Sequence, residues 1–594
     1  MDKKKFDLWN RIVALAVFLV AAVTYLLTIE PTASFWDCGE FIASSYKLEV
    51  GHPPGNPVFQ LFARFATMFT GPEHAAVAVN AMNAILSALT ILLLYLTTVF
   101  LVKRLVKAKA DGTYSLAKSI AIFGSGAVGA LAYTFSDTFW FSAVEGEVYA
   151  MSSLFTALVF WAMTKWYEQA DEPYANRWLV LIAFLMGLSI GIHLLNLLTI
   201  PALVFLFFYR KRETLPYTPL QQLGIFGVSV VILAFILYGV IPYLPQLAAV
   251  FDRFFVNTLG MPFNVGAAVF MLGLLGLCFY GLFYTMKTKK VLWNTVLLCL
   301  TMIIIGFSLF TIVIIRSSVK TPTNEYQPDN PYTLIRYLGR EQYGSNPLIY
   351  GQAFESPYDF EDKTYWAPSN LASDLEENKS DEYVEVPAPA EPKYHSEGKM
   401  FFPRMWSSDD NHKKFYMTYV KNPKHKTYVH KDSQGRESVR SYIMPSFLDN
   451  LSYFFDYQIN WMYLRYFMWN FAGRQNDVHG QEPNQFNGNW ECGIDFIDHA
   501  RLGDQSNAPV PLRDNKGKNH YYMLPLLLGL IGIFFQYARD KRGCWVTFLM
   551  FFMTGIAIVV YLNQPPYQAR ERDYAYAGSF DTFSIWIGIA VVAL

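Results

Sequence analysis

The sequence is poor in charge and in cysteine. Only 16% of its 594 residues are Asp, Glu, Lys or Arg, the formal net charge is zero, and there are five cysteines. Because no basic stripe runs among the aromatic residues, the chain lacks the footprint of a nucleic-acid-binding protein, and we expect no nucleic acid partner. Cys38 and Cys492 lie in segments that we place outside the membrane, where they could pair in an oxidising compartment.

Motifs for metals and nucleotides are also missing. The sequence contains no His-x-x-x-His, His-Glu-x-x-His or Cys-x-x-Cys spacing, and no glycine-rich loop that follows a strand. Asp37, Glu40 and Glu147 could hold a divalent ion through oxygen atoms alone. We nevertheless expect no obligatory metal and no cofactor.

Apolar residues are abundant. Hydrophobic residues make up 53% of the chain and aromatic residues 17%, and a bilayer crossing needs roughly 20 apolar residues. The composition predicts an all-α polytopic membrane protein with about twelve transmembrane helices. The apolar windows are 9–29, 76–102, 119–135, 142–164, 178–192, 194–209, 222–242, 264–286, 291–315, 522–538, 543–562 and 580–594.

The orientation follows from the basic residues in short loops. When the windows are counted in order, five basic clusters fall on one side, which we predict to be cytoplasmic. The first apolar run shows no cleavage pattern and is expected to remain as a helix. The final window is still apolar at Leu594, which suggests the front part of a longer protein. The clusters are Lys3–Lys5, Lys103–Lys118, Arg210–Arg212, Lys287–Lys290 and Arg539–Arg542.

The predicted organisation has three parts. Residues 1–315 form an N-terminal transmembrane module, 316–520 an outward soluble domain, and 521–594 the C-terminal transmembrane helices. The outward stretch is too long for a simple connection, so we expect it to fold. Two segments within it stand out. Residues 361–399 have the acidic, proline-rich composition of a mobile segment, and 447–471 are predicted to form an aromatic helix at the membrane interface that closes over a site.

The candidate site begins in the first outward loop, residues 30–75. Asp37 and Glu40 are three residues apart, so a helix would place both carboxylates on one face, where one could accept a proton while the other orients it. The structural alternative is that Asp37 caps a helix and Glu40 is merely exposed. The rigid turn His52-Pro-Pro-Gly-Asn-Pro57 then returns the chain to the membrane and should fix His52 beside the same opening.

An acidic pair after the first helix, an aromatic helix and a His-Pro-Pro turn resemble the first outer loop of the protein O-mannosyltransferases. These belong to the C-type, polyprenyl-phosphate-dependent membrane glycosyltransferases (GT-C), and the likeness points to a bacterial member. In the family the two acids are adjacent, whereas here Asp37 and Glu40 are separated. The resemblance implies a GT-C-like helix bundle and transfer of a sugar, by this likeness mannose, from a polyprenyl-phosphate donor, with inversion, to a hydroxyl of an exported protein or a glycan.

By the same analogy Asp37 would act as the catalytic base, with Glu40 beside it. The phosphate leaving group needs a cationic clamp, and the outward loop Pro565–Tyr574 offers Arg570 and Arg572, whose planar forks suit phosphate. The alternative is an arginine pair that contacts lipid headgroups or neighbouring acids. Arg316, at the outer end of the ninth window, is a further candidate for the phosphate and an equally good candidate for a structural role.

Other polar residues are expected at the same opening. Glu145, Glu147 and Tyr149 begin the fourth window from outside, where acids also favour the positive end of a helix dipole. Acids that enter the membrane region usually face a cavity, so we assign these residues to substrate binding. His193 and Tyr574 join them, although a lone histidine at a tight turn is more often structural.

Two other classes of function remain open. A polytopic transporter or lipid flippase would also use about twelve helices, but its acids normally lie near the bilayer midplane, and here they gather at the outward ends. A scaffold of a secretion or motility complex would use the outward domain instead. The favoured interpretation is a glycosyltransferase of the cytoplasmic (inner) membrane, in contact with membrane lipids, whose active site faces the periplasm.

Overall fold

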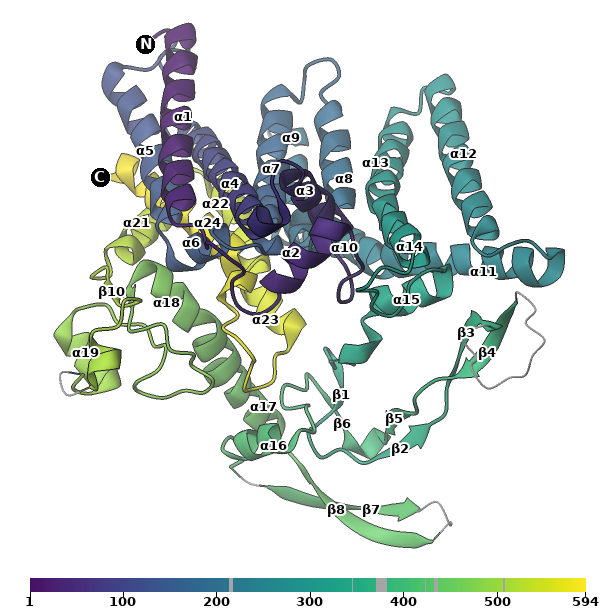
Figure 1. Cartoon of the computed structure of the whole chain (residues 1–594). Helices are drawn as coiled ribbons and strands as arrows, with labels where there is room; N and C mark the ends of the chain where they lie inside the picture. The colour runs from purple at the N-terminus through teal and green to yellow at the C-terminus, as the bar shows by residue number, and fades with distance from the viewer. Residues whose placement is uncertain (213–216, 345, 370–381, 422, 432–435, 506–507) are drawn as a thin grey trace.

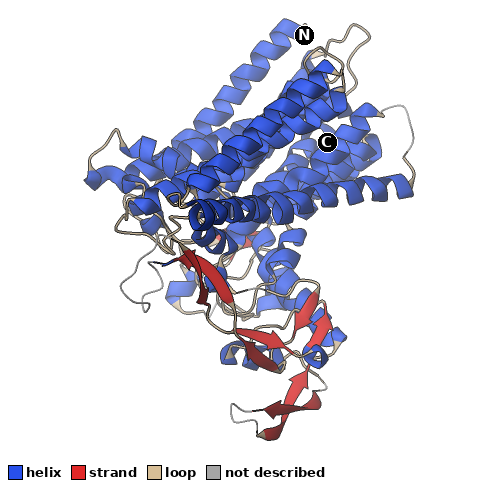
Figure 2. Ribbon diagram, turned by 90° about the vertical axis from the view of Figure 1, so that its right-hand side faces the viewer, coloured by secondary structure: helices blue, strands red, loops and turns tan. Residues whose placement is uncertain are grey.

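The computed structural model describes residues 1–594 except 213–216, 345, 370–381, 422, 432–435 and 506–507. A helical bundle forms one end of the molecule, and the strands gather at the other end, away from the N-terminus (Figures 1 and 2). Within the described residues ten helical segments are long and apolar enough to cross a membrane. The prediction of an all-α polytopic membrane protein is confirmed.

The predicted windows fall on helices throughout. Two of them, α8 and α21, are shorter than the ten long spans. The helices of the bundle are α1 (Lys3–Leu27), α4 (Ala75–Leu105), α5 (Leu116–Thr134), α7 (Val148–Gln169), α8 (Arg177–Ile190), α9 (Ile200–Lys211), α10 (Pro219–Ala234), α11 (Ile241–Leu259), α12 (Val265–Lys287), α13 (Val291–Phe307), α14 (Thr311–Ser318), α21 (Leu524–Arg539), α22 (Lys541–Met553), α23 (Ile556–Leu562) and α24 (Ala577–Ala593).

The segments between the predicted apolar windows contain further helices. The first loop holds α2 (Cys38–Lys47) and α3 (Pro57–Thr67), and α6 (Asp137–Ala143) begins before the fourth window and ends just inside it. Residues 243–263 are mostly helical, because a π-helical turn at Phe235–Val240 continues α10 into α11. Figure 1 shows α11 lying across the direction of α12 and α13. Its buried residues, which include Ala248, Asp252 and Val256, recur at helical spacing and form one face.

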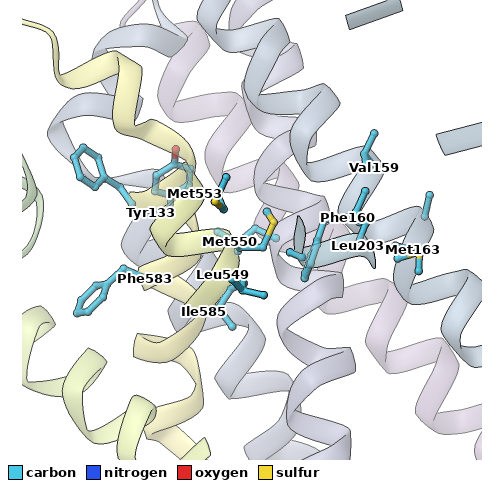
Figure 3. Close-up of a cluster of buried hydrophobic side chains, with 14 of the residues drawn as sticks. Tyr133, Val159, Phe160, Met163, Leu203, Leu549, Met550, Met553, Phe583 and Ile585 are labelled. Atoms are coloured by element: carbon cyan, nitrogen blue, oxygen red, sulfur yellow. The ribbon is translucent and has the colours of Figure 1, made fainter. Parts of the chain in front are cut away.

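The core of the bundle lies around α4, α5, α7 and α24. Figure 3 shows part of it, where Phe160, Leu203, Met550 and Met553 belong to one cluster of buried apolar side chains. Small residues let two helices approach closely: a Cβ on Gly588 of α24 would lie 2.4 Å from the Ser125 carbonyl oxygen of α5. This contact holds the C-terminal helix against the N-terminal module, which matters because the site described below joins both.

The outward part contains short helices and paired strands. Its described strands form five separate two-stranded antiparallel sheets. The elements are α15 (Pro331–Gly339), β1 (Tyr350–Gln352), β2 (Tyr358–Glu361), β3 (Thr364–Pro368), β4 (Tyr383–Pro387), β5 (Glu391–Tyr394), β6 (Lys399–Phe401), α16 (Asp410–Met417), β7 (Lys424–Lys431), β8 (Glu437–Met444), α17 (Phe447–Tyr453), η8 (Phe454–Leu464), α18 (Arg465–Phe471), β9 (Gly473–Arg474), α19 (Asp495–Leu502), α20 (Val510–Arg513) and β10 (Asn519–His520).

Two expectations about this part need correction. Residues 361–369 and 382–399 are not irregular, since they contain β3, β4 and β5 in regular antiparallel pairs; residues 370–381 lie outside the described residues. Cys38 and Cys492 are both buried and free. The Cys38 thiol donates to Glu145 and the Cys492 thiol to Asp498, so no disulfide joins them. The helix expected over 447–471 is present as α17, η8 and α18, with a π-helical middle.

Candidate active site

Asp37 stands at the start of α2, but its side chain does not cap the helix. It occupies the N-cap position and forms no capping hydrogen bond. Its carboxylate lies 3.5 Å from Nη2 of Arg570 and remains 45% exposed. Asp37 is therefore a partly open carboxylate beside a cation, as a base that must meet an incoming hydroxyl requires.

Arg570 lies at the centre of a cluster that it forms with Asp37, Glu147, Tyr149 and Tyr574. Its Nη1 donates to Oε1 of Glu147 at 3.0 Å and its Nη2 to the Tyr149 hydroxyl at 3.2 Å. Its Nε donates to the Tyr574 hydroxyl at 3.3 Å. The rings of Tyr149 and Tyr574 are stacked with centroids 4.1 Å apart. Because every nitrogen of the guanidinium group has a partner, its direction is fixed, and the raised pKa of Arg570 keeps it charged.

The neighbouring Glu571 holds the loop from the opposite side. Its carboxylate accepts two hydrogen bonds from Arg465, at 3.2 and 2.7 Å, one from the Tyr466 hydroxyl at 2.6 Å and one from Gly480 N–H at 2.8 Å. Burial acts to raise the pKa of Glu571, but these bonds outweigh it and the pKa is lowered. Glu571 is a positioning residue, since it anchors the loop from which Arg570 extends.

Arg465 sits in an aromatic cage that sequence reasoning missed. Its guanidinium carbon lies 4.3 Å from the Trp461 ring centroid, 4.4 Å from Tyr466 and 4.9 Å from Trp469. The signal was in the sequence, because Trp461 and Trp469 lie four residues before and after Arg465 and must share its helix face. The aromatic helix thus meets the site through the arginine loop.

Arg572 has fewer side-chain partners than Arg570, the other arginine of the loop. It donates from Nε to Gln568 at 3.1 Å and from Nη1 to the Tyr574 hydroxyl. Within the described residues it has no carboxylate within 4.0 Å, unlike Arg570. An arginine without an anionic partner next to a partnered one leaves positive charge available for a phosphate.

Glu145 and Glu147 lie behind Arg570. Nδ2 of Asn83 donates to the carbonyls of both, at 2.7 and 2.6 Å, and so fixes this turn. Burial, then the charge of Glu147, raises the pKa of Glu145 to about 8. Burial also raises the pKa of Glu147, although Arg570 opposes this. Glu145 is therefore protonated at neutral pH, which leaves the Glu147 and Asp37 carboxylates facing Arg570.

Glu40 and His52 form a separate pair next to Asp37. Oε1 of Glu40 accepts from the backbone N–H of His52 at 2.7 Å and lies 3.0 Å from its Nδ1. The hydrogen bond to Glu40 is the main cause of the raised pKa of His52, and Asp37 adds to it. The turn is held from outside by Tyr337 of α15, whose hydroxyl donates to the Gly51 carbonyl at 2.7 Å. Glu40 thus fixes the turn rather than facing Arg570 with Asp37.

His193 lies at the inner edge of the cluster. Its ring centroid is 5.6 Å from that of Tyr149, and its Nδ1 accepts from the Leu195 N–H. Burial, then the charge of Arg340, lowers the pKa of His193 to about 4, so the ring is neutral. Arg340, at the end of α15, is a cation near this edge that the sequence pattern did not reveal.

Arg316 lies elsewhere. Its Nε donates to the Leu48 carbonyl at 2.6 Å and its Nη2 to the Lys47 carbonyl at 3.0 Å. These carbonyls are at the C-terminal end of α2, where an arginine satisfies backbone groups that the helix leaves free. The structure therefore gives Arg316 a capping contact and does not bring it to Arg570.

The cluster offers charge rather than a metal centre. The described residues contain no group of three or more His, Cys, Asp or Glu side chains arranged to hold a metal ion. Beneath the two stacked tyrosines is a cavity of about 30 Å³ lined in part by Thr90, Ser152 and Asp581, which is room for about one water. What remains at the surface is a half-exposed carboxylate, Asp37, beside the fixed guanidinium group of Arg570.

Similarity to known proteins covers the N-terminal part of this site, from Asp37 to His193, and does not reach Arg570. Residues 37–216 match the N-terminal domain of the family described as Protein O-mannosyl-transferase TMEM260. The N-terminal third of the chain is therefore protein O-mannosyltransferase-like. The match starts at Asp37 and extends past His193, so it includes both acidic turns. Residues 344–455 match a family of unknown function, DUF8416.

Individual relatives agree with the family match. The chain is 25% identical over 212 residues to the protein O-mannosyl-transferase tmem260 of Dictyostelium discoideum, which covers 34% of this chain and 24% of that protein. It is 30% identical over 207 residues to the protein O-mannosyl-transferase TMEM260 of Mus musculus, and this match covers 34% of this chain and 27% of that protein. The likeness thus spans about a quarter of the length of these relatives. The resemblance expected from the sequence is confirmed at the level of a protein O-mannosyltransferase-like family.

Proposed function

We propose that the chain is an inverting glycosyltransferase that moves mannose from a polyprenyl-phosphate donor to a serine or threonine hydroxyl of an exported protein. The observation that carries the proposal is the contact of Asp37 with Arg570, which sets a half-exposed base beside a fixed cation. The similarity of residues 37–216 to protein O-mannosyl-transferase TMEM260 supports the sugar and the class of acceptor. Membership of the C-type branch and a bacterial origin are part of the proposal.

The chemistry follows from the two charges. The acceptor oxygen attacks the anomeric carbon of the sugar while Asp37 takes its proton, and the bond from that carbon to the phosphate oxygen breaks. Attack from the face opposite the phosphate inverts the anomeric carbon. The phosphate leaves as an anion, so it needs positive charge more than a proton. Arg572, which has no carboxylate partner in the described chain, and Arg570 supply that charge.

The buried acids Glu145 and Glu147 set the charge around Arg570. Glu147 keeps Arg570 in place through a 3.0 Å ion pair. Glu145, whose pKa is about 8, stays neutral at pH 7 and so adds no repulsion toward a phosphate. In this proposal Tyr149, Tyr574, His193 and the Glu40–His52 pair would contact the sugar, and the two arginines do the electrostatic work that a metal does in other transferases.

The location is part of the same proposal. The outward part lies at the end of the bundle opposite the N-terminus (Figure 1), and basic loops predict that the N-terminal side is cytoplasmic. The site then faces the periplasm from the inner membrane, and the donor arrives as a lipid within the bilayer.

The test is transfer of radiolabelled mannose from a polyprenyl-phosphate donor to exported protein in membranes with native chain, Asp37→Asn or the exposed-acid control Asp514→Asn at equal abundance. We expect label with the native chain and the control, and a loss of at least about 100-fold with Asp37→Asn, as for removal of a general base. Equal label with Asp37→Asn would remove this residue from the chemistry. No label with any chain would favour a transporter, a flippase or a scaffold.

A further inference from the structure

We propose that a groove in the outward part binds an extended segment of the acceptor polypeptide, and this inference rests on the proposed function. The groove lies between two hairpins, β2–β5 and β7–β8, which diverge from a common base (Figure 1). It encloses about 1110 Å³. This exceeds the roughly 300–1,000 Å³ of a pocket for one small ligand, so the space suits a chain segment better than a single sugar.

One wall is the β2 strand. It carries Tyr358, Asp359 and Phe360, with Asp362 just beyond its end. Phe360 is 69% exposed and Tyr358 39%, a large aromatic surface left in water. Asp359 is held by Nε2 of His395 at 2.9 Å, whereas Asp362 has no such partner in the described chain. This wall is aromatic and acidic.

The opposite wall is one face of the β7–β8 hairpin. Tyr428 of β7 lies opposite Arg440 of β8, and His430 is two residues further along β7. All three side chains therefore lie on the same face of the hairpin, which lines the groove. Nδ1 of His430 is buried and has no hydrogen-bond partner among the described residues. This wall is aromatic and basic.

The two walls are fixed at their base, so the groove is formed before a ligand arrives. Oε2 of Glu355 accepts from the Ile443 N–H at 2.7 Å, and the Tyr442 hydroxyl donates to the Glu397 carbonyl at 3.1 Å. A preformed groove costs little to order on binding.

A polypeptide fits this groove better than a glycan. Acid on one wall and base on the other complement a chain that carries both signs, as proteins do, while a neutral glycan gains nothing from them. β2 also belongs to a two-stranded sheet, so its second edge is unpaired within the described residues. Such an edge can hydrogen-bond the backbone of an extended peptide.

The groove is connected to the catalytic loop by one helix. Lys413 of α16 lines the groove, and on the same helix the rings of His412 and Phe415 lie 6.3 and 5.6 Å from that of Tyr567. Tyr567 is three residues before Arg570 in the loop of the active site. A segment held in the groove would therefore be retained close to the site while a nearby hydroxyl reacts.

The experiment uses the full chain in lipid nanodiscs with Asp37→Asn, so that binding is measured without turnover. The probes are fluorescent peptides with one threonine and mixed charges, one of about 20 residues, which can extend over some 60 Å, and one of about five. The groove variant is Phe360→Ala with Tyr428→Ala, and Arg440→Glu is a second, independent one. The matched control is Val429→Ala with Val439→Ala, exposed on the other face of the same hairpin.

We expect the dissociation constant of the long peptide to rise about tenfold in both groove variants, as for loss of aromatic or charged anchors, and to stay unchanged in the control. The short peptide should bind alike in all chains. Equal binding of the long peptide to native and groove chains would overturn the proposal, as would its displacement by a neutral mannose oligosaccharide. The two proposals can fail separately. If the native chain transferred no mannose but the groove variants still weakened binding of the long peptide, the proposed enzymatic function would be wrong and the peptide-binding groove would stand.

Discussion

Arg570 and Glu147 form a buried ion pair, with 3.0 Å between Nη1 and Oε1, and their side chains are only 7% and 0% exposed. The pair is doubly secured, because Tyr149 and Tyr574 bind the same guanidinium group. Removing one member of a buried pair leaves the other charge uncompensated, which costs more than the pair itself contributes. The behaviour of variants in this cluster should reflect that asymmetry.

Glu147→Gln should destabilise the protein by about 3 kcal/mol, since Arg570 then loses its buried counterion. Arg570 would keep only Asp37, at 3.5 Å, as an anionic partner. A base held more tightly by a cation is a weaker base, so we also expect kcat for mannose transfer to fall at least about tenfold. Thermal unfolding in detergent and transfer kinetics measure the two effects. Unchanged kcat with reduced stability would limit Glu147 to a structural role.

Arg570→Lys tests the geometry of the clamp rather than its charge. A lysine cannot make the three directed bonds of the guanidinium group, so we expect kcat/KM for the lipid donor to fall about 10–100-fold, or about 1.4–2.7 kcal/mol. Arg513→Lys is the matched control, because within the described residues the ion pair of Arg513 is an exposed one with Asp514. If both substitutions were equally mild, the fork of Arg570 would not be needed for the phosphate.

Glu145→Gln should alter how stability depends on pH. The pKa of Glu145 rises from the ordinary 4.5 to about 8, first through burial. The folded state then holds a proton that the unfolded state releases. The stability from this group is therefore complete below about pH 4.5 and is lost as pH rises to about 8. We expect the variant to match the native chain at pH 4.5 and to exceed it by about 2–4 kcal/mol at pH 8.

Melting temperatures of the two chains at several pH values decide this prediction. Glu172→Gln, on the exposed surface, is the control for simple loss of an acid. Parallel curves for native chain and Glu145→Gln would mean that Glu145 ionises normally and that Arg570 faces three carboxylates instead of two.

The Glu40–His52 pair has a different pH window. The hydrogen bond to Glu40 raises the pKa of His52 above 6.5, so that contribution is complete below 6.5 and is lost as pH rises. Burial opposes the lowered pKa of Glu40, but His52 outweighs it, so that contribution is complete above 4.5 and is lost as pH falls. We expect a double-mutant cycle of Glu40→Gln and His52→Gln to give a coupling of about 1 kcal/mol near pH 5.5, and less at pH 8. Equal coupling at both pH values would contradict an ion pair.

The helices could be predicted because each leaves a periodic or continuous apolar signature, and all twelve apolar windows fall on helices. Asp37 and Arg570 could be proposed as partners only through a family resemblance, since no local pattern links the first outward loop to the last. The placement of Arg316 was ambiguous for a physical reason: the end of a helix offers carbonyls that attract a guanidinium group as strongly as a phosphate would.

The strands of the outward part were harder to predict from the sequence than the helices. Residues 361–399 have a charged, proline-rich composition that is typical of irregular segments, yet the described portions pair as hairpins. Few of their side chains are fully buried, so the strands lack the alternation of buried apolar and exposed polar residues that identifies a strand at the edge of a core. A groove built from two such hairpins leaves no trace in hydrophobic periodicity.

The contact of Asp37 with Arg570 also has a consequence for biosynthesis. Asp37 is translated and inserted early, whereas Arg570 emerges only after the whole outward part and most of the bundle. Since domains fold broadly in the order of synthesis, the ribosome-bound intermediate has a base with no cation beside it. In the proposed transferase the two charges would therefore come together only once the segment that carries Arg570 has been made and α24 packs against α5.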